Sequence, residues 1–167
     1  MKKNLFFAII ILSAIFSPKA FAQVIDSAFY RWSVYEIQEN ELEHKKCYIV
    51  SYPVKTDSNH SSRQRPWIMI TRFQKDRSEE VSVFGGFEYK LNSEIFLMVD
   101  KQLLKMKAKR DIAWAPTKTD DIKIIQSLLN GAVLRIRSNS AVGTYAIDEY
   151  SLKGITRAYG RMKEICK

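Results

Sequence analysis

The chain of 167 residues carries 27 lysines and arginines against 18 acidic residues, which gives a formal net charge of +9. A positive surface favours anionic partners such as lipopolysaccharide, phospholipid head groups or sulfated glycans, although moderate basicity also serves solubility alone. No zinc-finger, helix-turn-helix or RNA-binding signature appears in the sequence, so the common nucleic-acid-binding modules are excluded.

The first 22 residues have the three regions of a secretory signal peptide. Lys2 and Lys3 form a basic start, residues 5–16 are almost wholly apolar, and Ala20 and Ala22 stand where a signal peptidase reads small residues. The apolar run is too short to cross a hydrocarbon core of about 30 Å as a helix, and no lipoprotein cysteine stands at the cut. We expect cleavage after Ala22, with an uncleaved N-terminal anchor as the alternative.

Cleavage leaves one domain, residues 23–167, which is long enough for a single hydrophobic core. It removes three lysines and no acid, so the formal charge of the mature chain is +6. We expect this domain in the periplasm, or secreted and associated with the outer envelope, with no transmembrane segment.

The first half of the mature chain is predicted to form short strands, because β-branched and aromatic residues alternate with polar ones or cluster in short runs. The predicted strands are 29–37, 46–52, 66–73 and 80–84. Within the first of them, Trp32 and Val34 share one face. Residues 55–65 contain no core-forming side chain and are predicted to be a polar loop. Gly85 and Gly86 indicate a turn or a bulge.

Residues 94–99 are apolar on both faces, which predicts a strand covered on both sides, or alternatively a short buried helix. Asp100 and Lys101 are expected to form a tight turn into a partner strand at 103–106. A further short strand is predicted at 111–115, where Pro116 ends it.

A helix is predicted to follow Thr119 as its N-cap, with Asp120 and Asp121 in the first turn, where negative charge is favourable. Gly131 is the expected C-terminal stop. The apolar residues at helical spacing are Ile122, Ile125, Leu128 and Leu129.

Residues 132–137 and 145–150 are predicted to pair as two strands, and a second helix is predicted after Ser151. The residues expected on one face of that helix are Ile155, Ala158, Tyr159, Met162 and Ile165. The element order predicts a mainly β protein, an antiparallel β-sandwich or flattened barrel with two short helices on its rim, the second of them C-terminal.

Cys47 and Cys166 are the two cysteines of the chain. In an exported protein such a pair is most simply a disulfide, because the compartment is oxidising. The alternatives are a free thiol or a metal ligand. Neither cysteine has a second cysteine or histidine nearby at zinc spacing, and His44 alone is insufficient.

The sequence shows no complete catalytic set. His60 lies among serines, but a nucleophilic serine needs a base held by a third group and an oxyanion hole, and no Gly-x-Ser-x-Gly elbow is present. We therefore expect no enzymatic activity, no cofactor and no metal site. A hydrolase built on His60 is the least favoured alternative.

Clusters of basic residues are the better candidates for contact with an anionic envelope or host-surface partner. The candidate contact residues are Arg63, Arg65, Lys105, Lys107, Lys109, Arg110, Arg135 and Arg137. Arg135 and Arg137 are expected on the outer face of their strand, with Leu134 and Ile136 turned inward. The alternative is a solvated face whose lysines protect edge strands from pairing with other chains.

Tryptophans more often fill a core than bind a ligand. Trp114 is the exception to consider, because it precedes Pro116 in a short segment. An exposed Trp114 would favour a second function, a periplasmic module that binds a glycan or another small ligand.

The order of several short motifs resembles the invasion-associated locus B family of exported alphaproteobacterial proteins. The motifs are Trp32-Ser33-Val34, Cys47, Arg65-Pro66, Ala113-Trp114, Leu129 with Gly131, and the closing segment Tyr150-Ser151-Leu152-Lys153-Gly154 leading through Ala158 to Cys166. The closing segment is the most specific of them.

This resemblance implies a small periplasmic or outer-envelope β-sandwich protein, associated in pathogenic members with entry into host cells. The resemblance assigns no catalytic residue to this chain, because none is established for the family. Family members often carry another cysteine just after the Trp-Ser-Val strand, where Tyr35 stands in this chain. The departure leaves Cys47 with Cys166 as the only available pairing.

Overall fold

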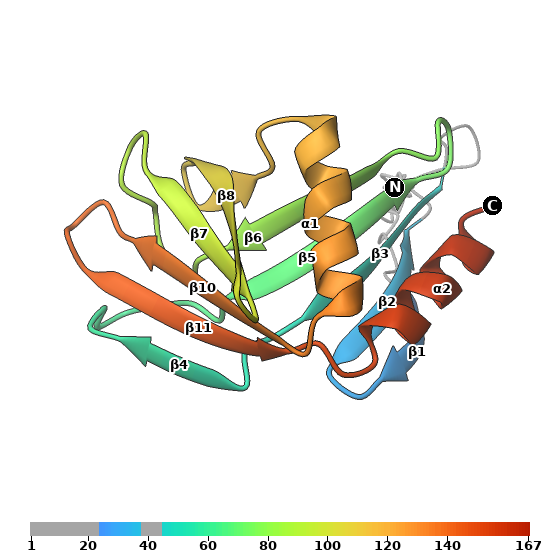
Figure 1. Cartoon of the computed structure of the whole chain (residues 1–167), viewed down its shortest axis with the longest axis horizontal. Helices are drawn as coiled ribbons and strands as arrows, with labels where there is room; N and C mark the ends of the chain where they lie inside the picture. Colours follow the sequence, from blue (N-terminus) through green and yellow to red (C-terminus); the bar gives the residue numbers. More distant parts are fainter. Residues whose placement is uncertain (1–23, 38–44) are drawn as a thin grey trace, which may run out of the picture.

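The computed structural model describes residues 24–37 and 45–167, so the predicted signal peptide and His44 lie outside the described residues. The strands are β1 (Val24–Phe29), β2 (Trp32–Ile37), β3 (Lys46–Ser51), β4 (Lys55–Ser58), β5 (Trp67–Phe73), β6 (Glu79–Phe84), β7 (Glu94–Val99), β8 (Gln102–Lys109), β9 (Ile112–Trp114), β10 (Val133–Asn139) and β11 (Tyr145–Ser151). The helices are α1 (Lys118–Asn130) and α2 (Ile155–Ile165). The mainly β class and the C-terminal second helix are confirmed (Figure 1).

The described strands form one antiparallel sheet in the order β1-β2-β3-β5-β6-β9-β8-β7-β10-β11-β4. Its two halves join where the short β9 pairs with the end of β8 at Lys107–Lys109. The inner faces of the halves meet in one core, where the indole of Trp32 in β2 donates a hydrogen bond of 3.1 Å to the carbonyl oxygen of Ser151 in β11. The molecule is therefore a single sheet that bends into a sandwich.

Both helices cover the inner face of the first half of the sheet (Figure 1). Helix α1 contacts β6, and α2 contacts β1, β2 and β3. Helix α2 buries Ile155, Ala158 and Met162, with Tyr159 and Ile165 packed beside them, so its predicted apolar face is confirmed. None of the helices in the described part of the chain is long and apolar enough to span a membrane.

The disulfide between Cys47 and Cys166 is present, with the two Cα atoms 5.8 Å apart. Cys47 lies on the inner face of β3 and Cys166 ends α2, and both are fully buried. The bond fastens the C-terminal helix to the sheet.

Two predicted strand and loop assignments are wrong, and the strand predicted at 94–99 is confirmed but not its covering on both faces. Residues 29–37 are not one strand, because β1 turns into β2 at Tyr30, whose positive φ of 58° forms a tight turn. The polar segment 55–65 begins with strand β4, which pairs with β11 through its backbone and needs no apolar side chain. Strand β7 is covered on its inner face only, since Met98 on the outer face is 44% exposed.

The start of α1 also differs from the prediction. Thr117, not Thr119, is the N-cap, and its side-chain oxygen accepts a hydrogen bond from the backbone N–H of Asp120. Helix α1 consequently buries Ile124, and Ile122 points outward, 56% exposed.

Candidate functional site

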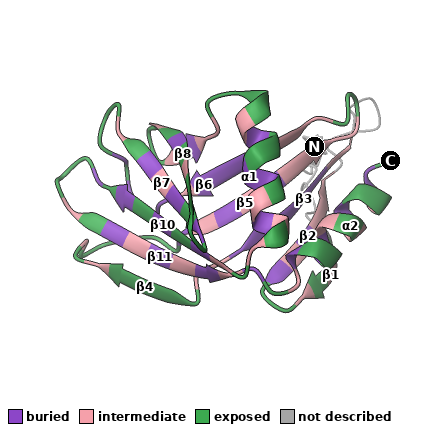
Figure 2. Ribbon diagram, in the orientation of Figure 1, coloured by how far each residue is buried: buried purple, intermediate pink, exposed green. Residues whose placement is uncertain are grey.

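The predicted basic residues of β8 and β10 lie on one outer surface of the sheet. Along β10, Arg135 and Arg137 are exposed and alternate with the buried Leu134 and Ile136, as predicted. Figure 2 shows the sheet coloured by burial, with exposed and buried positions along its strands. Along β8, Lys105 and Lys107 are exposed, with Met106 buried between them. We call the outward surface of β7, β8, β10 and β11 the basic face.

Strand register brings the two sets of cations together across β7. Phe96 of β7 is paired with Lys105 of β8 on one side and with Arg137 of β10 on the other. Because residues paired across antiparallel strands point to the same side of the sheet, all three side chains share the basic face. Residues distant in sequence thus converge on one surface.

The acidic residues of the basic face, Glu94 and Glu149, each form an ion pair with a basic residue of the same face. The ammonium of Lys105 lies 2.8 Å from a carboxylate oxygen of Glu94, and the guanidinium of Arg135 lies 2.8 Å from that of Glu149. Lys107, Lys109 and Arg137 have no acidic partner within residues 24–37 and 45–167. These exposed cations remain available to an external anion.

An apolar groove of about 480 Å³ lies within the basic face. Its apolar lining consists of Phe96, Met98, Leu103 and Ile147, and its polar lining of Arg135, Arg137 and Asn139. None of these apolar residues is among the contact residues predicted from the sequence. The sequence does contain a sign of this groove. Residues 94–99 are apolar on both faces of their strand, and only one of these faces belongs to the core.

Arg63 is not part of the basic face, which corrects its assignment as a contact residue. Its side chain is only 8% exposed and forms a bidentate ion pair with the buried Asp148 of β11. Its Nε donates to the carbonyl oxygen of Gly85 at 2.7 Å, and its guanidinium lies over the Phe87 ring, 5.1 Å from the centroid. The guanidinium of Arg63 is neutralised by Asp148 inside the protein, so it is not accessible to an external anion.

The remaining candidates lie apart from one another. Arg65 is exposed and stacks on Tyr52 in the other half of the sheet, with its guanidinium carbon 3.7 Å from the ring centroid. Arg110 is exposed in the turn between β8 and β9, next to Lys109. Trp114 is half-buried on β9, where it pairs with Lys107 and therefore borders the basic face.

Among the residues that the structure describes, His60 has a hydroxyl partner and no acidic one. Its Nδ1 lies 2.7 Å from the Thr144 hydroxyl, which in turn contacts Ser140, and its ring packs 5.1 Å from that of Phe87. Because a catalytic base of this kind is held by a third group, usually a carboxylate, this arrangement does not complete a hydrolase triad. These contacts fasten the β10–β11 turn.

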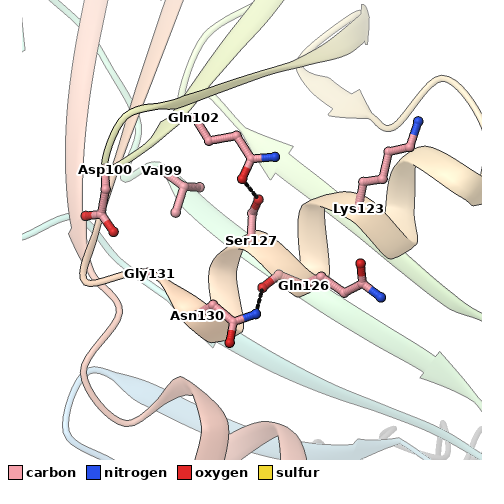
Figure 3. Close-up of a pocket in the computed structure, with 8 residues that line it drawn as sticks. All are labelled: Val99, Asp100, Gln102, Lys123, Gln126, Ser127, Asn130 and Gly131. Carbon is pink, nitrogen blue, oxygen red and sulfur yellow. Dashed lines mark hydrogen bonds between the residues drawn. The ribbon is translucent and has the colours of Figure 1, made fainter.

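A polar hollow of about 290 Å³ lies between α1 and the β7–β8 turn (Figure 3). The Ser127 hydroxyl donates to the amide oxygen of Gln102, and Asn130 donates to the carbonyl oxygen of Gln126 (Figure 3). The carboxylate of Asp100 accepts backbone hydrogen bonds from Ala132 and Val133, so it holds the chain after α1. The one hydroxyl among the residues that line the hollow, that of Ser127, is thus bonded to an amide and not to a base.

Three buried tyrosines illustrate how strongly the core is desolvated. Burial raises the pKa of Tyr48 to about 12, and it also raises the pKa values of Tyr89 and Tyr150 well above their usual value of 10.0. The Tyr150 hydroxyl has no hydrogen-bond partner in the described part of the chain. Among the residues described, no three histidine, cysteine or acidic side chains are grouped as a metal site would require.

Comparisons with known proteins identify a family by sequence and a similar fold by structure. The family model for Invasion associated locus B (IalB) protein matches residues 32–163. The crystal structure of invasion associated protein b from Bartonella henselae superposes with a TM-score of 0.58 and 14% sequence identity, over 83% of this chain and 96% of that chain. At that identity the likeness shows the fold alone. None of the curated proteins matches this chain.

Proposed function

The chain belongs to the invasion associated locus B family, and from this premise we propose that it is an exported, non-enzymatic protein of the cell envelope that binds an anionic partner through the basic face. The partner belongs to the envelope itself or to the surface of a host cell. The basic face, and not a catalytic centre, is the functional surface.

One observation carries this proposal. Lys107, Lys109 and Arg137 are gathered on one outer surface and lack acidic partners in the described segments, although neighbouring Lys105 and Arg135 are neutralised. A cluster of exposed like charges attracts anions and repels itself, so the concentration of these cations on one face favours a binding role. Export is supported by the signal-peptide pattern of residues 1–22 and by the buried disulfide, which is typical of oxidising compartments.

The test is salt-dependent binding to anionic membranes. The oxidised protein, purified from the periplasm of an expressing bacterium, is mixed with vesicles of phosphatidylglycerol, with vesicles of phosphatidylcholine, and with lipopolysaccharide. We expect sedimentation with the anionic targets at about 50 mM salt and its loss at about 500 mM, where charges more than a few ångströms apart are screened. Binding that does not change with ionic strength would contradict a mechanism in which the basic face attracts an anionic partner.

Matched variants assign the binding to the basic face. Lys107→Glu with Lys109→Glu should abolish sedimentation, because the two substitutions reverse charges on the basic face. Lys123→Glu with Lys163→Glu changes the net charge equally on α1 and α2, and it should leave binding nearly intact. Equal losses from both pairs would mean that net charge alone attracts the protein.

A second candidate function, a glycan-binding or small-ligand module, is favoured by one arrangement of aromatic rings. Trp67, Phe84 and Trp114 lie on the outer face of the first half of the sheet, and the rings of Trp67 and Phe84 stack 5.6 Å apart. All three are half-buried, so part of each ring is accessible. A glycan-array signal that Trp114→Ala removes would support this function in place of the first.

A further inference from the structure

We infer that the apolar groove binds a single-chain amphiphile with an anionic head group, a carboxylate or a phosphate, whose chain lies on Phe96, Met98, Leu103 and Ile147 and whose head group meets Arg137. This inference rests on the proposed function and names the class of ligand. It concerns one groove within the basic face, and it predicts binding of individual molecules as well as binding to a charged surface.

The lining of the groove is suited to an apolar chain. Met98 is 44% exposed and Leu103 is 55% exposed, and the register pairs them directly across β7 and β8. Phe96 and Ile147 complete the floor on either side of Arg137. Leaving such a patch in water is unfavourable, and a volume of about 480 Å³ lies in the range of small-molecule sites.

The charge within the groove selects an anion. Arg137 is the one arginine of the lining without an ion pair among the described residues, since Arg135 is held by Glu149. Its cross-strand neighbours are Phe96 and Ile147, so an anion there would meet a cation beside an apolar surface. A guanidinium can donate two parallel hydrogen bonds to a carboxylate or phosphate, and such bonds are stronger than neutral ones.

The sheet itself argues against a peptide strand in the groove. β7 pairs with β8 and β10, and β10 pairs with β7 and β11, so both edges of the strands in the centre of the groove are occupied by backbone hydrogen bonds. A ligand is recognised here through side chains. A chain of methylene groups with one anionic end satisfies both the apolar floor and Arg137.

Calorimetric titration of the oxidised protein below the critical micelle concentration tests the inference. The ligands are octanoate, decanoate, dodecanoate and monododecyl phosphate, with butanoate and dodecyl maltoside as controls. We expect dodecanoate or monododecyl phosphate to bind, the short acid and the neutral amphiphile to bind at least about tenfold more weakly, and affinity to rise by up to about fourfold for each buried methylene. The stronger of the two twelve-carbon ligands identifies the head group.

Two pairs of variants locate the ligand. Leu103→Ser should weaken dodecanoate binding by about tenfold, whereas Ile122→Ser removes an equally exposed side chain, 56% against 55%, from α1 and should change nothing. Arg137→Gln should lower affinity for both anionic ligands, whereas Lys123→Gln should not. Circular dichroism and thermal melts establish that each variant is folded.

The outcomes separate this inference from the proposed function. If Leu103→Ser leaves dodecanoate binding unchanged, if affinity is independent of chain length, or if no monomeric amphiphile binds, the inference is overturned. Salt-dependent sedimentation with phosphatidylglycerol vesicles would in those cases still support the basic face. Loss of sedimentation together with retained, chain-length-dependent binding of dodecanoate would instead contradict the proposed function and leave the groove as the only site.

Discussion

Arg63 is the residue whose role depends most on its surroundings. It lies in a polar segment, yet its guanidinium bonds to Asp148 on β11 and to the Gly85 carbonyl oxygen after β6. Thr56 of β4 donates a further hydrogen bond of 2.8 Å to the same carboxylate. The ion pair and its hydrogen bonds therefore join four segments of the chain: the one that carries Arg63, β11, β4 and the turn after β6. Gly86 (φ +78°) lets the chain pass close to the backbone of Gln64.

We expect Arg63→Ala to destabilise the fold by about 3–5 kcal/mol, because it leaves the carboxylate of Asp148 buried without its cation. Arg65→Ala removes an exposed cation over Tyr52 and should cost less than about 1 kcal/mol. Urea unfolding of both variants measures the difference. Similar, small costs for the two substitutions would contradict a structural role for the Arg63–Asp148 pair.

Tyr159 should make the stability of the protein depend on alkaline pH. Burial and a 2.7 Å hydrogen bond from its hydroxyl to Glu79 raise the pKa of Tyr159 above its usual value of 10.0. The folded state therefore holds this proton more tightly than the unfolded chain does, so the stabilisation is complete below about pH 10 and is lost as the pH rises beyond it. Urea unfolding between pH 8 and pH 11 should show a shallower decline for Tyr159→Phe, and parallel profiles would contradict this assignment.

Among the helices and strands, those whose residue pattern already favours the observed structure are predicted best from the sequence. The β10–β11 hairpin has full alternation and was predicted closely. Strand β4 was missed because its residues, Lys55 to Ser58, carry no apolar signal and depend on the backbone of β11. The sequence places the start of helix α1 two residues late, because Thr119 directly precedes Asp120 and Asp121 whereas Thr117 precedes Lys118.

The N-cap of α1 can be tested by a pair of threonine substitutions. Thr117→Ala should cost about 1 kcal/mol, because the backbone N–H of Asp120 loses its side-chain acceptor. Thr119 lies inside the helix, where alanine is the better helix former, so Thr119→Ala should be neutral or slightly stabilising. Thermal melts compare the two, and a larger loss for Thr119→Ala would place the N-cap two residues later.

For the whole molecule, the disulfide is the main covalent constraint. It links positions 119 residues apart in sequence and holds α2 against β3. The bend of the sheet then closes the core between the two halves, and it leaves the outer surfaces exposed to solvent. The basic face is one of those surfaces.

Replacing both cysteines, Cys47→Ser with Cys166→Ser, should lower the free energy of unfolding by about 4–5 kcal/mol, because the unfolded chain regains the entropy that the closed loop removes. Reduction of the unsubstituted protein should give a similar loss. Urea unfolding with and without reductant measures both effects. An unchanged midpoint in the double variant would show that helix α2 is held by its apolar face alone.

The sequence by itself determined the local properties of this protein: the leader pattern, the mainly β class, the apolar face of α2, the cysteine pair and the outward direction of Arg135 and Arg137. These follow from composition and from periods of two or 3.6 residues, which are readable along the chain. The tertiary structure alone decided which basic residues are available. It buried Arg63 against Asp148, and it aligned Phe96 and Met98 with Arg137 and Leu103 into a groove. Strand register and the bend of the sheet depend on contacts between distant segments, and no local pattern contains them.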